Sequence, residues 1–331
     1  MWSSLYFLQL VAVLLVLGNT LGAHGTQLAY DYYKLSCPFV ETIVKEEMLS
    51  IFLTDVSAPS AFLRLFFHDC QVQGCDASIL LDSHDYFNQN PELASSKNFG
   101  IRKQENIGHI KSRLELVCPG QVSCADIIAL AAKESVLFTG GPHINIPLGR
   151  KDSTIRTYSK QADANLPSPG ITVDQFLHIF TSKGVNLEES VAILGAHTLG
   201  VGHCMNIVNR LYDKKPGDDD HQDGMDLAFK AMLRLKCPTR VPLTNLTVVS
   251  NDLTPLVFDN QYYTNILMGK GLFGIDSSIS SDPRTKPIVG RFAADQNYFF
   301  NVFSSAFVKL SSTNALTHKK GEVRRQCNRI N

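Results

Sequence analysis

Apolar side chains recur every three or four residues along much of the chain, which is the spacing of one face of an α-helix. The first such stretch ends at a break over residues 55–59 and contains Val40, Ile43, Val44, Met48, Ile51 and Phe52. Farther on, Ser123 with Asp126 is typical of a capping box that opens a helix over residues 127–138. Alternation of apolar and polar residues, the pattern of a strand, is scarce. The pattern therefore predicts a mainly α-helical protein.

Two further helices are predicted after a loop rich in Pro, Ser and Asn over residues 150–170. Thr172 with Gln175 opens the first of these helices, and Asn186 caps the second, which runs to His197. Because the Pro-rich loop interrupts the helical pattern, we interpret it as the seam between two lobes.

The chain begins with an apolar run from Leu5 to Leu17, which small residues at Ala23 and Gly25 follow. This order is typical of a secretory signal peptide, so we expect residues 1–25 to be removed. A membrane anchor is the alternative, but the run is shorter than the ~20 apolar residues that span a bilayer. We therefore expect a secreted protein without a membrane anchor.

The rest of the chain, residues 26–331, has the size of one large domain. We expect a distal lobe over about residues 26–170 and a proximal lobe over about residues 171–331. The 31 Lys and Arg residues balance the 31 Asp and Glu residues, and no basic run is present. Because nucleic-acid binding requires a basic surface, we expect no nucleic acid among the partners.

The chain contains 8 cysteines. An even number in a secreted protein predicts disulfides, here four. Zinc is the alternative, but the sequence has no C-x-x-C motif and its spacings match no zinc finger.

The first candidate for chemistry is the helical segment that contains Arg64 and His68. A spacing of four residues places both side chains on one helix face, among apolar neighbours. Asp69, Asp76 and Ser78 follow, with Gly74 at a turn. Oxygen ligands at alternating positions in a loop that two cysteines can clamp are typical of a calcium site. The alternative is an amphipathic helix end with a disulfide-pinned turn, but the loop directly behind the Arg–His pair favours a functional site.

The second candidate is His197, which small residues flank on the predicted helix. Such flanks leave room for a flat cofactor, although a lone histidine is more often a hydrogen-bonded residue of the core. Asp276 follows an apolar segment, and a buried carboxylate needs a partner. A metal-bound histidine that donates a hydrogen bond to Asp276 would be such a partner.

These motifs resemble those of secreted plant-type (class III) haem peroxidases, the horseradish-peroxidase-like family, over essentially all of residues 26–331. The matching segments are RLFFHDC at 64–70, GCDAS at 74–78, VSCAD at 122–126, PLGRKD at 147–152, ANLP at 164–167, GAHT at 195–198, FDN at 258–260, KGL at 270–272, and Cys327. The resemblance implies a plant-peroxidase-like helical fold with one haem b between distal and proximal helices. It implies that His197 binds the iron and that Asp276 accepts the Nδ1 proton of His197.

On the distal side, the resemblance implies that His68 moves a proton between the two peroxide oxygens, as a general base and then a general acid. Arg64 would stabilise the charge of the departing oxygen. Asn98 would accept a hydrogen bond from His68, and Pro167 would line the substrate entrance.

The resemblance also implies two calcium ions. The distal ion would be bound by Asp69, the carbonyls of Val72 and Gly74, Asp76, Ser78, and Glu92 through water. The proximal ion would be bound by Thr198, Thr254, the carbonyl of Val257, and Asp259. Asn251 stands where the family has an aspartate in the proximal site, and either Asn251 or the adjacent Asp252 would complete it. Because Asn251 lacks a negative charge, we expect the proximal ion to bind more weakly.

The disulfide pairing that the resemblance implies is Cys37–Cys118, Cys70–Cys75, Cys124–Cys327 and Cys204–Cys237, the third tying the C-terminus back. Asn245 begins the only N-x-[ST] sequon, so at most one N-glycan is expected. Gln71 replaces a phenylalanine of the family, and we interpret it as a surface change. Ile144 occupies the place of a frequent tryptophan.

The resemblance implies a monomeric peroxidase of the cell wall space that reduces hydrogen peroxide and oxidises small phenols by one electron. A haem protein without turnover is one alternative, but such a carrier gains little from Arg64 and His68 together. A calcium-binding wall protein with a vestigial haem site is another. Haem absorbance and peroxide turnover distinguish the three.

Overall fold

The computed structural model describes residues 28–82, 90–213, 224–241 and 246–331. The expected signal peptide, residues 1–25, and the expected glycosylation site, Asn245, lie outside these ranges. The described residues are mainly helical, as the apolar pattern predicted, and their only sheet has two strands.

Four long helices form most of the N-terminal half: α2 (Val40–Thr54), α3 (Ala58–Val72), α4 (Gln104–Val117) and α5 (Cys124–Phe138). The hydroxyl of Ser123 accepts a hydrogen bond from the backbone N–H of Asp126, so α5 begins at Cys124, three residues before the predicted start. The side chain of Asp126 does not complete a capping box. It accepts hydrogen bonds from Arg150 and Tyr33 instead.

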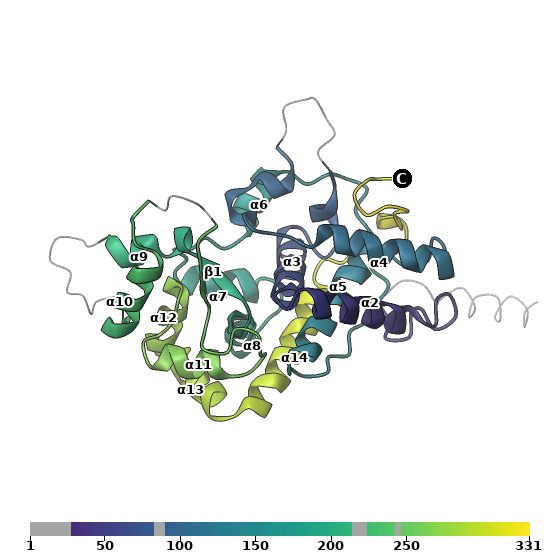
Figure 1. Cartoon of the computed structure of the whole chain (residues 1–331). Helices are drawn as coiled ribbons and strands as arrows, with labels where there is room; N and C mark the ends of the chain where they lie inside the picture. Colours follow the sequence, from purple (N-terminus) through teal and green to yellow (C-terminus); the bar gives the residue numbers. More distant parts are fainter. Residues whose placement is uncertain (1–27, 83–89, 214–223, 242–245) are drawn as a thin grey trace, which may run out of the picture.

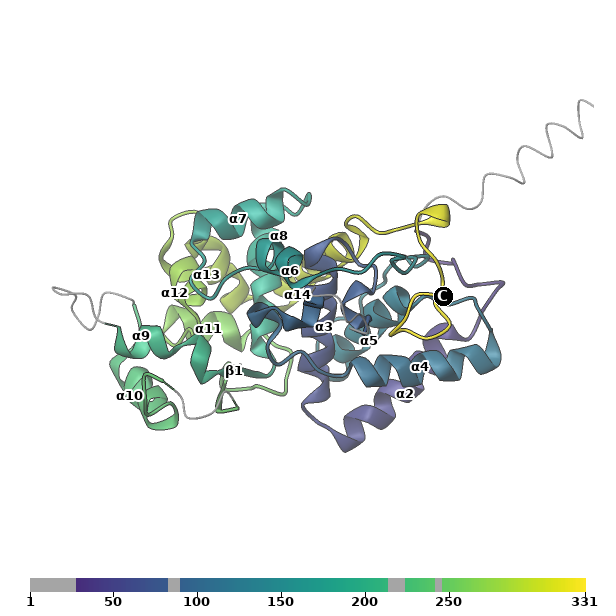
Figure 2. The same ribbon diagram turned by 90° about the horizontal axis from the view of Figure 1, so that it is seen from above.

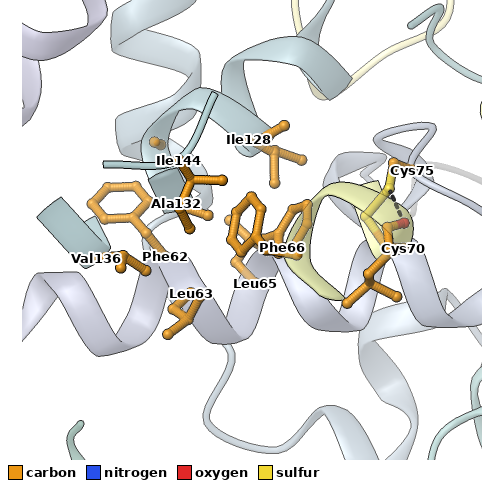
Figure 3. Close-up of a cluster of buried hydrophobic side chains, with 14 of the residues drawn as sticks. Phe62, Leu63, Leu65, Phe66, Cys70, Cys75, Ile128, Ala132, Val136 and Ile144 are labelled. Atoms are coloured by element: carbon orange, nitrogen blue, oxygen red, sulfur yellow. Dashed lines mark hydrogen bonds between the residues drawn. A yellow bond between two sulfur atoms is a disulfide. The ribbon is translucent and has the colours of Figure 1, made fainter. Parts of the chain in front are cut away.

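Helix α3 packs along α5 at the centre of the molecule (Figures 1 and 3). The contact joins Phe62, Leu65 and Phe66 of α3 to Ile128 and other apolar residues of α5, all of them buried. Burial of apolar surface is the main favourable term in folding. It therefore holds the helix that carries Arg64 and His68 in a fixed position.

Short elements connect these helices. Between α3 and α4 lie the 3₁₀ helices η1 (Ser78–Leu80), η2 (Glu92–Ala94) and η3 (Ser96–Asn98), and α6 (Ser159–Asn165) follows α5. Because α6 contacts α3, η2 and η3, it lies over the segment that ends at Asn98.

The C-terminal half consists of shorter helices. They are α7 (Val173–Thr181), α8 (Leu187–Leu194), η4 (Gly195–Thr198), η5 (Cys204–Asn206), α9 (Val208–Tyr212), α10 (Leu227–Lys236), α11 (Gln261–Leu267), α12 (Gly274–Ser281), α13 (Lys286–Ala294), α14 (Gln296–Ser312) and η6 (His318–Lys320). Strands β1 (Val201–His203) and β2 (Val248–Ser250) pair antiparallel, Gly202 opposite Val249. The predicted capping boxes of α7 and α8 are both present.

Helix α14 joins the two halves. It packs on α8 and also on α3, where Phe307 stacks on Phe66 with ring centroids 4.4 Å apart. Figure 2 shows α7 and α9 to α13 on one side of the molecule, α2, α4 and α5 on the other, and α3 and α14 between them. One large cluster of buried apolar side chains contains residues of both halves. The two expected lobes therefore share a core.

Four disulfides brace this fold, as the even cysteine count predicted. They join Cys37 to Cys118, Cys70 to Cys75, Cys124 to Cys327, and Cys204 to Cys237, which are the pairs that the family resemblance implied. The Cys124–Cys327 bond spans 203 residues of sequence and ties the C-terminal segment to the start of α5.

Candidate active site and cation sites

Helix α3 presents Arg64 and His68 on one face, as their spacing predicted. The Nε of Arg64 lies 3.3 Å from Nε2 of His68, and a terminal nitrogen of Arg64 donates to the carbonyl of Lys97. His68 is buried, so both groups lie in an environment with little water. Burial lowers the pKa of the Arg64 guanidinium to about 10, which leaves it charged at neutral pH.

The tautomer of His68 follows from its neighbours. The amide nitrogen of Asn98 donates to the carbonyl of Glu92 at 2.8 Å, so the amide oxygen of Asn98 is the atom that lies 2.6 Å from Nδ1 of His68. Nδ1 must then carry the proton and donate a hydrogen bond to the amide oxygen of Asn98. The other nitrogen, Nε2, is unprotonated, and its lone pair accepts a long hydrogen bond from Nε of Arg64.

Electrostatics keep His68 neutral. Its pKa is lowered from 6.5 to about 3, first by burial and then by the positive charge of Arg64. The hydrogen bond to Asn98 opposes this shift. At neutral pH, His68 is therefore a base next to a permanent cation.

The second histidine, His197, lies in η4, where α8 tightens after Leu194. Its Nδ1 lies 3.0 Å from Oδ1 of Asp276. This is the contact that the family resemblance implied and that the spacing of the two residues alone could not show. Asp276 also accepts hydrogen bonds from the phenol of Tyr262 and from the backbone N–H of Phe273. These donors fix the orientation of the carboxylate, and the carboxylate in turn fixes the imidazole.

This arrangement fits an iron ligand. Asp276 is buried, whereas the side chain of His197 keeps 33% of its surface exposed. Because Nδ1 donates to Asp276, Nε2 of His197 is the nitrogen left with a free lone pair. A carboxylate that holds the second nitrogen of a histidine is the arrangement expected of a metal-bound histidine.

Gly195, two residues before His197, lies at a close contact between structural elements. A Cβ on Gly195 would come 2.5 Å from the ring of Phe299 and 2.6 Å from the hydroxyl of Tyr263. Gly195 therefore allows η4 to pack closely on α14 and α11.

Several side-chain oxygen atoms lie close together in and around the loop that follows His68, where the sequence predicted a calcium site. Asp69 accepts from the backbone N–H of Ala77, Asp76 accepts from that of Ser78, and the Ser78 hydroxyl donates to Glu92. One carboxylate oxygen each of Asp69 and Glu92 is buried without a hydrogen-bond partner. Burial and then mutual repulsion raise the pKa of Asp69 well above its usual value and that of Glu92 to about 8.

Buried carboxylates that repel one another, two of them with an oxygen that lacks a donor, fit a divalent cation. Within the described ranges, no three His, Cys, Asp or Glu side chains form a complete ligand group on their own. Hydroxyl and carbonyl oxygens would therefore have to complete the distal set, as the resemblance implied for Ser78, Val72 and Gly74.

The proximal cluster distinguishes the two residues, Asn251 and Asp252, that the sequence left as alternatives. Oγ1 of Thr198 lies 2.8 Å from Oδ2 of Asp252 and 3.1 Å from Oδ1 of Asp259, and Thr254 lies beside both carboxylates. Thr198 also lies 3.4 Å from the carbonyl of Val257. Asp252, not Asn251, thus faces this group.

Asn251 turns the other way. Its amide nitrogen donates to the carbonyl of Leu199, and its amide oxygen is buried without a hydrogen-bond partner. Both residues lie in the bend that follows strand β2, and there the two side chains have different partners. Burial, and the nearby charge of Asp259, raise the pKa of Asp252 to about 6, so this cluster also fits a cation.

The segment that ends at Pro167 is held by polar contacts from the distal side. The ammonium of Lys97 donates to the carbonyls of Asp163 and Leu166, and the amide of Gln71 donates to the carbonyl of Asn165. Gln71 is only 2% exposed, so the expectation of a surface position was wrong. Helix α3 continues past Cys70 to Val72, which carries Gln71 under α6.

Two residues of the site were not found from sequence. Tyr262 follows the FDN segment at 258–260, and that motif was the only signal of its place beside Asp276. Arg324 lies next to the distal carboxylates, although it is close to the chain end and far from them in sequence.

The helical fold and its two histidine sites point to the haem peroxidases as a class. The family model described as Peroxidase matches residues 44–295. The chain is 49% identical to Peroxidase 29 of Arabidopsis thaliana over 319 residues, which cover 95% of this chain and 92% of that relative. It is 39% identical to Peroxidase 21 of Arabidopsis thaliana over 92% of this chain and 91% of that relative. It is 38% identical to Peroxidase 5 of Vitis vinifera over 92% of each.

The chain therefore belongs to the peroxidase family, and it is an enzyme that uses haem to reduce hydrogen peroxide. Among the described residues, no helix is long and apolar enough to cross a membrane.

Proposed function

We propose that the chain is a secreted, monomeric peroxidase that couples the reduction of hydrogen peroxide to the one-electron oxidation of small phenols. The observation that carries this proposal is His68, which is buried and neutral, with its unprotonated Nε2 facing Arg64 and its Nδ1 in contact with Asn98. A protein that only carries haem has no use for a buried base next to a fixed cation.

Haem bound at His197 would supply the iron that accepts the two oxidising equivalents of peroxide. The protein then has two tasks on the distal side. Nε2 of His68 takes a proton from one peroxide oxygen and gives it to the other, which leaves as water. Arg64 stabilises the negative charge that develops on the leaving oxygen before that proton arrives.

Two phenol molecules complete the cycle, each losing one electron and one proton, so that one peroxide and two phenols yield two waters and two phenoxyl radicals. Pro167 lies in the segment that Lys97 and Gln71 hold near the distal side. We assign this segment to the entrance for phenols.

We further propose that both carboxylate clusters bind calcium. The distal set is Asp69, Asp76, Ser78 and Glu92 with the carbonyls of Val72 and Gly74. The proximal set is Thr198, Asp252, Thr254 and Asp259 with the carbonyl of Val257. Four disulfides support an oxidising, extracellular location, for which the cell wall space is the family's usual place.

The test is to produce residues 26–331, load them with haem, and compare His68→Ala with His109→Ala. His109 is an exposed histidine of α4 and serves as the matched control. We expect His68→Ala to slow the reaction with peroxide by roughly 10²–10⁴-fold, the usual contribution of a general base. His109→Ala should leave it unchanged. A His68→Ala protein that reacts at the wild-type rate, or a wild-type protein that binds haem without oxidising phenols, contradicts the proposal.

A further inference from the structure

The loop of residues 74–78, called the distal loop below, is covered by the C-terminal segment of the chain. Gly74 has φ +123°, and a Cβ on it would come 2.6 Å from the carbonyl oxygen of Asn314. The sulfur of Cys75 lies 3.4 Å from the carbonyl of Leu310, at the end of α14. Residues more than 230 positions apart in sequence thus form one surface around the candidate distal cation site.

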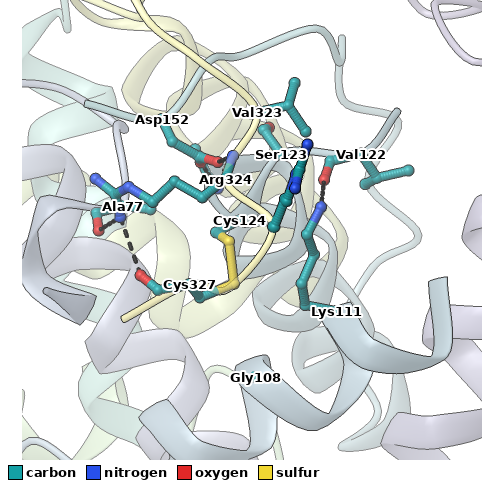
Figure 4. Close-up of a disulfide and its surroundings, with 12 residues drawn as sticks. Ala77, Gly108, Lys111, Val122, Ser123, Cys124, Asp152, Val323, Arg324 and Cys327 are labelled. Carbon is teal, nitrogen blue, oxygen red and sulfur yellow. Dashed lines mark hydrogen bonds between the residues drawn. A yellow bond between two sulfur atoms is a disulfide. The ribbon is translucent and has the colours of Figure 1, made fainter. Parts of the chain in front are cut away.

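Arg324 makes the most specific of these contacts. One terminal nitrogen donates to the carbonyl of Ala77 at 2.8 Å and to that of Cys327 at 3.1 Å. The other terminal nitrogen donates to the carbonyl of Ser153 at 2.7 Å. Arg324 is fully buried, and Figure 4 shows its side chain between Ala77 and the Cys124–Cys327 disulfide.

The backbone around Arg324 is fixed as firmly as its side chain. Its N–H donates to the carboxylate of Asp152 at 2.9 Å, and Asp152 and Glu322 exchange two backbone hydrogen bonds. Ser153 in turn donates from its backbone N–H to the carbonyl of Asp76. The guanidinium therefore joins three chain segments, around residues 77, 153 and 327, and two of them also contact each other.

Ala77 is the residue of the distal loop that most needs such support. It has φ +56°, in the left-handed region that a non-glycine residue rarely adopts. Its N–H donates to Asp69, so its conformation decides where the Asp69 carboxylate is held. The neighbouring Asp76 and Ser78 belong to the same proposed ligand set.

We propose that Arg324 is a positioning residue through which the C-terminal segment holds the distal loop in the conformation that binds calcium. This inference rests on the distal calcium site proposed above. Calcium affinity depends on the rigidity of a site as well as on its charge, and the planar guanidinium can hold carbonyls in two directions at once.

If Arg324 acted through its charge alone, it would weaken calcium binding at the distal loop. A buried cation near Asp69 and Asp76 competes with calcium for the same carboxylates, so its removal would tighten calcium binding. The positioning role and the competing-charge role therefore differ in two ways. Removal of Arg324 lowers calcium affinity in the first and raises it in the second, and lysine can replace arginine only in the second. Lysine keeps the charge but loses the planar fork.

The experiment compares Arg324→Lys and Arg324→Gln with wild type in calcium titrations of the full secreted chain. Protection of backbone amides from deuterium exchange is followed separately in peptides of residues 69–80 and 250–260. We expect both substitutions to weaken calcium binding at the distal loop about tenfold, as the loss of a hydrogen bond from a charged group would do. Calcium binding at residues 250–260 should stay unchanged and serves as the internal reference.

Two control variants complete the comparison. Arg325→Gln changes the exposed neighbour of Arg324 and should not alter calcium binding. Val289→Ala lowers stability in the buried face of α13, away from the distal loop, and separates general destabilisation from loss of loop position. If Val289→Ala weakens distal binding as much as Arg324→Lys, the inference is overturned.

The remaining outcomes are equally informative. Tighter distal binding in Arg324→Gln, with Arg324→Lys equal to wild type, would mean that Arg324 acts only as a competing charge. A wild-type distal loop that gains no protection with calcium would remove the proposed calcium site and this inference together. If wild type gains protection and both Arg324 variants match it, only this inference fails.

A measurement on the unsubstituted protein covers the case in which the Arg324 variants do not fold. Coupling between two sites is reciprocal, so calcium bound at the distal loop must also stabilise the C-terminal segment. We expect calcium removal to increase deuterium exchange in residues 322–330. Unchanged exchange in these residues, while residues 69–80 lose protection, would overturn the inference.

Discussion

The side-chain oxygen of Asn98 lies 2.6 Å from Nδ1 of His68, while the amide nitrogen of Asn98 donates to the carbonyl of Glu92. Asn98 thus connects the candidate base to a residue whose carboxylate belongs to the distal cation cluster. The connection sets the tautomer of His68, and through it leaves Nε2 as the unprotonated nitrogen that can take a proton from peroxide.

Replacing Asn98 tests this connection. Asn98→Ala removes the acceptor of Nδ1, and we expect the reaction with peroxide to slow by up to about tenfold, the effect of one neutral hydrogen bond. Asn98→Asp keeps an acceptor but adds a negative charge, which raises the pKa of His68. The acid limb of the stopped-flow pH profile should therefore move to higher pH in Asn98→Asp. Identical profiles for both variants and wild type would contradict the role of Asn98.

The pKa of His68 gives a prediction for the wild-type enzyme. Because burial and Arg64 lower this pKa to about 3, His68 is unprotonated at neutral pH. We expect the rate of the peroxide reaction to stay constant over neutral pH and to fall only in acid, as His68 gains a proton. A rate that falls already between pH 7 and pH 6 would show that another group controls this step or that His68 is less buried.

Calcium removal should make stability depend on pH through the distal carboxylates. Burial raises the pKa of Glu92 from 4.5 to about 8, so the folded state favours its protonated form. The stability that this group contributes is fully present below its unfolded pKa of 4.5 and is lost as pH rises through about 8. Calcium binds the ionised carboxylates and should reverse this loss.

The measurement is the thermal midpoint of calcium-loaded and calcium-free protein between pH 5 and pH 9. We expect the difference between the two midpoints to grow with pH. Other titrating groups affect both forms alike, so the difference isolates the cation clusters. A difference that stays constant or shrinks toward high pH would contradict the proposed ligands.

The sequence predicted the helical class, the cap of α5, the capping boxes of α7 and α8, and the helix face shared by Arg64 and His68. These features depend on neighbours within one or two helical turns, so local patterns are sufficient to find them. The family resemblance added the disulfide pairs and the partner of His197, which no spacing could have supplied.

Other features depend on long-range packing and were not predictable in this way. Gln71 appeared to be a surface residue because its burial depends on α6, more than 80 residues later. The close approach of Gly195 to Phe299 of α14 likewise depends on packing between segments far apart in the sequence. The place of Arg324 beside Ala77 results from the Cys124–Cys327 bond and from the course of the chain after α14.

A buried ion pair should matter far more to stability than an exposed one. Arg150 and Asp126 are both fully buried and joined at 2.8 Å, whereas the Arg113 side chain of the Arg113–Glu47 pair is 63% exposed. Asp126→Ala leaves the charge of Arg150 buried without its partner, so we expect the free energy of unfolding to fall by about 3–5 kcal/mol. Arg113→Gln should lower it by less than about 1 kcal/mol. Denaturant titration with the disulfides intact measures both, and equal effects would contradict this account.

The proximal cation cluster allows a choice between two adjacent residues. Asp252 lies 2.8 Å from Thr198 and accepts a hydrogen bond from the backbone of Thr254, while Asn251 donates to Leu199 on the other side of the chain. We therefore expect Asp252→Asn to weaken calcium binding at this cluster, because calcium affinity falls with the number of carboxylates. Asn251→Asp should not strengthen it, although that change would restore the residue type of the family at this position.

Thr198 follows His197 directly, so calcium bound at this cluster fixes the backbone next to the candidate iron ligand. Loss of the ion should loosen the hydrogen bond between His197 and Asp276 and change the absorption spectrum of the bound haem. A chelator titration that follows haem absorbance and calcium release together measures this effect. Asp252→Asn should shift both transitions to lower chelator concentration, and Asn251→Asp should shift neither. Tighter binding in Asn251→Asp, with no effect of Asp252→Asn, would return the ligand role to Asn251.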